Sequence, residues 1–117
     1  FEAGCDICGT DTLRSASYAE CKAAAQLAKS ASAGAAKKDP ERPRFVAGVL
    51  GPTSHSLSAP SSAEDPSKRS TTWGALVETY SEQVRGLVDG GVDLLALEAV
   101  ADTLNAKAAI FAIDEFF

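Results

Sequence analysis

The sequence predicts an α/β fold of parallel strands, as a fragment of about three βα units from a (β/α)8 TIM barrel. Three short apolar segments that suit buried strands alternate with three longer segments of helical periodicity. Such alternation implies parallel strands joined by right-handed crossovers. The strands recur every ~40 to 50 residues, which fits a barrel with insertions in its connections. A doubly wound sheet is the rival, but no G-x-G-x-x-G motif opens the first helix.

The first half of the chain contains two predicted strands and one long predicted helix. Residues 5–10 (CDICGT) suit a short strand, and the Ala-rich segment 16–38 has helical spacing until two prolines end it. FVAGVL at 45–50 suits a buried strand that ends in the Gly-Pro-Thr segment 51–53. The serine-rich segment 53–71 predicts one long connection without helix or strand, which is either a functional loop or a flexible surface loop.

The second half of the chain begins with the clearest helix. Residues 73–88 carry one apolar stripe at helical spacing, and Gly90-Gly91 can close its C-terminal end. LLALE at 94–98 is the last predicted strand, and so apolar a run is usually covered on both faces, as in parallel sheets. Asp102 or Thr103 can cap a final helix.

Composition indicates one soluble globular domain. The 117 residues are 45% hydrophobic and 23% charged, which is ordinary for such a domain. The net charge is −5 with scattered Lys and Arg, so we expect neither nucleic-acid nor membrane binding. No apolar stretch approaches the ~20 residues of a membrane span and no signal peptide is evident, which favours a cytoplasmic location. Met is absent and the chain runs from Phe1 to Phe117 without a closing cap, which indicates a piece of a longer protein.

The cysteines are predicted to be buried structural thiols rather than metal ligands. Cys5 and Cys8 fall within a predicted strand, where positions i and i+3 point to opposite faces. A zinc site needs further ligands, and only Cys21 and His55 are available. His55 itself lies in a polar loop and is expected to be solvated, so we assign no metal ligand in this chain.

Polar groups follow each predicted strand, at the end of the sheet where barrel active sites are built. Glu98 is the strongest candidate, because it ends an apolar strand where an unpaired carboxylate would be costly. It could bind a substrate ammonium group or act as a general base. The other candidates are Asp11 and Thr12 after the first strand, and Gly51, Pro52 and Thr53 after the second.

Structural alternatives stay open for each candidate. Glu98 could form an ion pair or a cap, and Asp11 with Thr12 could form a turn or helix cap. Gly51 and Pro52 could simply shape the exit of the chain from the sheet.

Two long stretches resemble a known family. RFVAGVLGPT (44–53) and GGVDLLALEAVADTLNAKAAIFAIDEFF (90–117) resemble the homocysteine S-methyltransferase family, in particular the homocysteine-binding domain of its cobalamin-dependent methionine synthases. LVETYSEQVRGL (76–87) and the Asp-Pro pair at 65–66 fit the same domain. AGCDICGTDT (3–12) resembles it less closely.

The resemblance implies a (β/α)8 barrel of which residues 1–117 would form the second to fourth βα units, a partial homocysteine-binding domain. It implies that Glu98 binds the amino group of homocysteine, and that the segments around Asp11 and Gly51–Thr53 line the same pocket. The zinc that activates the thiol is held in the family by later cysteines that have no match here. Zinc and methylcobalamin are therefore implied for the full-length parent, together with the rest of the barrel and a cobalamin-binding module, and none for this chain alone.

Departures from the family pattern lie near the predicted pocket. Asp11-Thr12-Leu13 stands where the family has an Asn-Thr-Phe run, and Ala99 and Ala101 replace a Thr and a Phe after the glutamate. The expected function is that of the homocysteine-binding part of a methionine synthase-like methyltransferase, which makes methionine, with the isolated chain inactive. The alternatives are a non-catalytic barrel remnant, or another (β/α)-barrel enzyme that uses Glu98 as general base.

Overall fold

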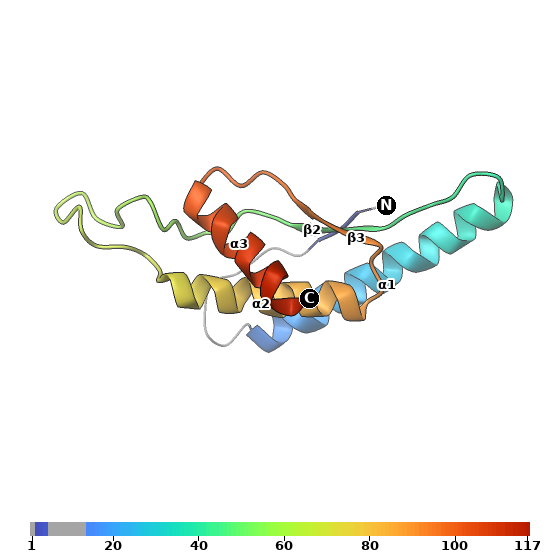
Figure 1. Ribbon diagram of the computed structural model, residues 1–117, viewed down its shortest axis with the longest axis horizontal. Coiled ribbons are helices and arrows are strands. Elements are labelled where there is room, and N and C mark those ends of the chain that lie inside the picture. Colours follow the sequence, from blue (N-terminus) through green and yellow to red (C-terminus); the bar gives the residue numbers. More distant parts are fainter. Residues whose placement is uncertain (1, 5–13) are drawn as a thin grey trace.

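The computed structural model describes residues 2–4 and 14–117, with side chains from residue 17 onward. Strands and helices alternate along these ranges (Figure 1). The elements are β1 (Glu2–Gly4), α1 (Arg14–Lys38), β2 (Ala47–Leu50), α2 (Trp73–Asp89), β3 (Leu94–Leu97) and α3 (Thr103–Phe116). The expected alternation is confirmed there, while the strand expected at 5–10, with Cys5 and Cys8, lies outside the described residues.

The three strands form one parallel sheet in the order β1-β2-β3. Gly4 pairs with Val49 across the first interface, and Leu50 pairs with Leu97 across the second. The predicted parallel arrangement is therefore confirmed. A (β/α)8 barrel requires this sequential order, but one half of a doubly wound sheet has it as well. Closure into a barrel stays a prediction.

The helices form one layer in which α2 packs between α1 and α3 (Figure 1). The molecule is elongated, at 58 × 25 × 25 Å. Its core joins Tyr80, Val84 and Leu87 of α2 to Val46 and Leu50 of the β2 segment, all of them fully buried. The predicted apolar stripe is thus the face of α2 that packs on the sheet.

The ends of α2 and α3 follow the capping chemistry of the sequence. Thr72 accepts a hydrogen bond from the amide of Ala75 at 3.3 Å, which caps the start of α2. Gly91 closes the other end with φ of 91°, a backbone conformation that favours glycine. Asp102 caps α3 by accepting from the amide of Leu104 at 2.9 Å, so the predicted glycine closure of α2 and the predicted Asp102 cap are both confirmed.

The apolar strand β3 is less covered than the sequence predicts. Leu94 is 48% exposed and Leu97 is 36% exposed, so the expectation that both faces are covered is wrong here. Leu94 points to the face opposite Leu95, and among the described residues the single layer of helices leaves that face uncovered. Leu97 lies on an edge strand, because β3 pairs only with β2 among those residues. Leu95 packs against the core from the face toward the helices.

Two further expectations concern the cysteines and the membrane. Cys21 is fully buried, as expected, but it is disulfide-bonded rather than a free thiol. Among the described helices, none is both long enough and apolar enough to cross a bilayer.

Asp93 links three segments at the amino end of β3. Its carboxylate accepts two hydrogen bonds from the Lys29 ammonium, at 2.8 and 2.9 Å, and one from the amide of Val46 at 2.7 Å. The Lys29 ammonium, followed by the Val46 amide, lowers the pKa of Asp93 below its ordinary value. The carboxylate therefore ties α1 to both β2 and β3.

Acid is expected to weaken the fold partly through Asp93. A carboxyl whose pKa is lower when folded contributes stability above its unfolded pKa of about 3.9, and this stability is lost as the pH falls through the folded value. Urea unfolding midpoints measured between pH 6 and pH 2 should therefore fall less steeply for Asp93→Asn than for the wild type. Asp114→Asn, at an exposed carboxylate near the end of α3, should follow the wild-type slope. Equal slopes for Asp93→Asn and the wild type would contradict this role.

Candidate functional site

Glu98 lies at the carboxyl end of the sheet, as the sequence predicts. Its amide donates to the carbonyl of Leu50 at 3.1 Å, so the ladder continues one residue beyond β3. Because Leu50 pairs with Leu97, Gly51 and Glu98 are the next neighbours in this register. The Glu98 side chain is exposed, and no hydrogen bond or ion pair joins it to a described residue. Its carboxylate is thus available to a ligand at this edge.

Ala99 turns the chain sharply immediately after Glu98. Its φ is 54°, in the left-handed region, and it is the one non-glycine residue with positive φ among those described. A side chain in this region costs roughly 1–2 kcal/mol because Cβ crowds the backbone. Strained backbone of this kind is often found at functional sites.

Ala99→Gly is expected to stabilise the fold by about 0.5–1 kcal/mol, because glycine relieves the strain but has more freedom in the unfolded chain. Ala101→Gly is the matched control: Ala101 shows no positive φ, so the change should lower stability instead. Urea titration of both variants by circular dichroism gives the comparison. A loss of stability in both would show that Ala99 is not strained.

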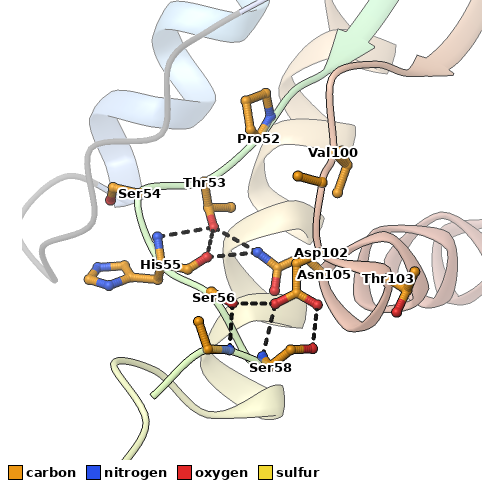
Figure 2. A pocket seen from close by; sticks show the side chains of 12 residues that line it. Pro52, Thr53, Ser54, His55, Ser56, Ser58, Val100, Asp102, Thr103 and Asn105 are labelled. Carbon is orange, nitrogen blue, oxygen red and sulfur yellow. Dashed lines mark hydrogen bonds between the residues drawn. The ribbon is translucent and has the colours of Figure 1, made fainter. Parts of the chain in front are cut away.

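A pocket of about 590 Å³ lies beside this edge, between the segment after β2 and the start of α3 (Figure 2). Its lining consists of residues 52–56, 58–59 and 100–103 together with Asn105. Pro52 and Thr53 of the predicted site belong to it, whereas Gly51 and Glu98 do not. That Gly51, Pro52, Thr53 and Glu98 contribute to one site therefore stays a prediction.

Asp102 is the most heavily hydrogen-bonded side chain of the pocket (Figure 2). Its carboxylate accepts from the hydroxyl of Ser56, from the amide and hydroxyl of Ser58 at 2.9 and 2.7 Å, and from the amide of Leu104. These donors, led by the Ser56 hydroxyl, hold the pKa of Asp102 well below its usual range. The group is an anion that anchors the serine-rich segment to α3.

Asn105, one turn into α3, holds the same segment. Its amide nitrogen donates to the hydroxyl of Thr53 at 3.0 Å and to the carbonyl of His55 at 2.7 Å. Its carbonyl oxygen accepts from the amide of Leu57 at 3.1 Å. The side chain is 3% exposed, so these bonds also satisfy a buried amide.

The backbone of Gly51 is hydrogen-bonded to a side chain of α2. The Tyr80 hydroxyl donates to the Gly51 carbonyl at 3.3 Å, and Tyr80 is fully buried. Burial raises the pKa of Tyr80, so the phenol keeps the proton that this bond requires. The Gly-Pro-Thr turn is therefore fixed at Gly51 by Tyr80 and at Thr53 by Asn105.

Sequence reasoning missed part of this arrangement. It assigned Asp102 to a helix cap only, and it overlooked Asn105 altogether. The available signal was an Asn inside a helix, where its propensity is poor and a tertiary role is common. Asp11 and Thr12 lie outside the described residues, so their predicted roles stay predictions.

Metal binding finds no support in the described part of the chain. Nowhere there do three or more His, Cys, Asp or Glu side chains converge as a metal site would require. Cys21 is already disulfide-bonded, and His55 stands as the sole histidine. These residues do not fit a zinc ion.

A profile of the homocysteine S-methyltransferase family matches residues 1–116. The chain belongs to the homocysteine S-methyltransferase family. Members of this family are named for methyl transfer to the sulfur of homocysteine. The match spans all described elements, including the segments that carry Thr53 and Asp102.

Proposed function

We propose that this chain is the homocysteine-binding portion of a methionine synthase-like methyltransferase, and that the parent domain is a (β/α)8 barrel. The observation that carries the proposal is Glu98, an exposed carboxylate at the carboxyl edge of a parallel sheet in a chain of this family. Homocysteine bears an ammonium group, which pairs with a carboxylate through charge-assisted hydrogen bonds. Glu98 would bind that group and orient the amino acid.

The contribution of this part of the chain would be orientation rather than activation of the thiol. Fixing the ammonium group restricts where the sulfur can lie, which is how positioned binding groups accelerate reactions. Gly51 is the register neighbour of Glu98, and Pro52 and Thr53 follow it on a turn that Tyr80 and Asn105 hold. We propose that these residues line the same site, and that zinc and methylcobalamin act from other parts of the parent protein.

Calorimetric titration of the purified chain with L-homocysteine tests the proposal. We expect saturable binding, and we expect 4-mercaptobutanoate, which has the thiol and carboxylate but no ammonium group, to bind at least about tenfold more weakly. Absence of homocysteine binding at millimolar concentration, or equal binding of the two ligands, would overturn it. Methionine formation from homocysteine and methylcobalamin by this chain alone would overturn the proposed division of roles.

A further inference from the structure

The first turn of α3 is bonded to the segment that follows β2 more extensively than helix capping requires. Asp102 accepts three hydrogen bonds from Ser56 and Ser58 in addition to the capping bond from Leu104. Asn105 makes three more, to Thr53, His55 and Leu57. We call Asp102 and Asn105 the latch, and Figure 2 shows both side chains directed at this segment.

The latch has little capacity left for a ligand. Two carboxylate oxygens offer about four acceptor sites, and the Asp102 carboxylate already accepts from four donors. Both amide hydrogens of Asn105 are also used, by the Thr53 hydroxyl and the His55 carbonyl. The two side chains therefore act on other residues rather than on a molecule in the pocket.

The residues that the latch holds include part of the proposed binding site. Thr53 is bonded to Asn105, and it lies two residues after Gly51, the register neighbour of Glu98. Asp102 lies four residues after Glu98, in the same connection between β3 and α3. The latch thus joins the connection that carries Glu98 to the connection that carries Thr53.

We propose that Asp102 and Asn105 are positioning residues for homocysteine, because they set the placement of the Gly51–Thr53 turn relative to Glu98. The inference rests on the proposed function. Bonds that are satisfied before the ligand arrives reduce the ordering cost of binding, so a loosened turn should weaken affinity. Loss of the latch should also speed hydrogen exchange at the amides of Leu57 and Ser58, which the latch bonds.

Asp102→Asn tests the latch without removing the helix cap, since Asn and Asp cap helices about equally well. The Ser58 amide loses its carboxylate acceptor, so we expect its hydrogen exchange to rise roughly five- to tenfold. Homocysteine affinity should fall by a similar factor, whereas the urea midpoint should fall only slightly because the helix cap is kept. Asn105→Ala should act in the same direction, with faster exchange at Leu57.

Asp65→Asn is the matched control, because Asp65 accepts from the amide and hydroxyl of Ser67 within the same serine-rich segment but does not reach α3. It should leave Ser58 exchange and homocysteine affinity unchanged. If amide hydrogen exchange at Ser58 is unchanged in Asp102→Asn, the latch does not hold this segment. Faster exchange with unchanged affinity would overturn the positioning role. If the wild type fails to bind homocysteine while the Ser58 amide still exchanges faster in Asp102→Asn than in the wild type, the proposed function fails. The latch is then part of the fold only.

Discussion

Gly86→Ala is expected to destabilise the fold by about 2–3 kcal/mol, although alanine is the better helix former. A Cβ atom at Gly86 would lie 2.5 Å from the carbonyl oxygen of Tyr18 and 2.9 Å from the Cβ atom of Cys21. Both contacts are to α1, and the first is to its backbone, which cannot rotate away. The two helices would have to separate, and that opens the core between them.

Gly34→Ala is the matched control for this substitution. Gly34 lies in α1, and a Cβ atom there would meet nothing within 4 Å. We expect it to stabilise the fold by about 0.5–1 kcal/mol, the ordinary helical gain from Gly to Ala. Urea unfolding followed by circular dichroism measures both variants. Equal stability of Gly86→Ala and the wild type would mean that α1 and α2 do not approach this closely.

Gly90→Ala gives an independent check of the same helix contact. A Cβ atom at Gly90 would lie 2.4 Å from the Cβ atom of Ala25 and 2.8 Å from the carbonyl oxygen of Lys22. Gly90 caps the C-terminal end of α2 one turn after Gly86, so the two glycines form one line of close approach along α1. Small residues at both positions let α2 lie this close to α1.

Local patterns predicted the three helices and the strands β2 and β3 because their causes are local, whereas β1 at Glu2–Gly4 was not predicted. The apolar stripe of α2, its glycine closure and the Asp102 cap each depend on residues within a few positions of one another. The parallel sheet followed from the alternation of strands and helices. The exposure of Leu94 was not predicted, because it depends on what lies beside β3 rather than on the strand itself.

Features that depend on distant partners could not be predicted in this way. Gly86 is an ordinary helix interior position until α1 is placed against it. Asn105 bonds to Thr53, which lies 52 positions earlier, and no spacing rule connects them. The position of Glu98 could be predicted because it follows an apolar strand of a parallel sheet, whereas its role in binding stays a prediction.

Glu98→Gln is expected to weaken homocysteine binding about tenfold, because it removes the charge that would attract the ammonium group. The exposure of Glu98 limits the effect, since solvent screens a surface pair. The substitution should leave the urea midpoint close to that of the wild type, as most exposed changes do. Glu115→Gln, an exposed carboxylate on α3, is the control and should keep wild-type affinity.

Comparison of two ligands separates an ammonium contact from an indirect effect. In the wild type, homocysteine should bind more tightly than 4-mercaptobutanoate, and in Glu98→Gln that difference should largely disappear, because the residue and the ammonium group form one pair. If the difference persists at full size, the ammonium group is held by another residue. If Glu98 were instead a general base, Gln would impair turnover in the parent enzyme and leave the affinity of both ligands unchanged. Measuring the affinity of both ligands for the wild type and for Glu98→Gln therefore distinguishes a binding carboxylate from a proton acceptor.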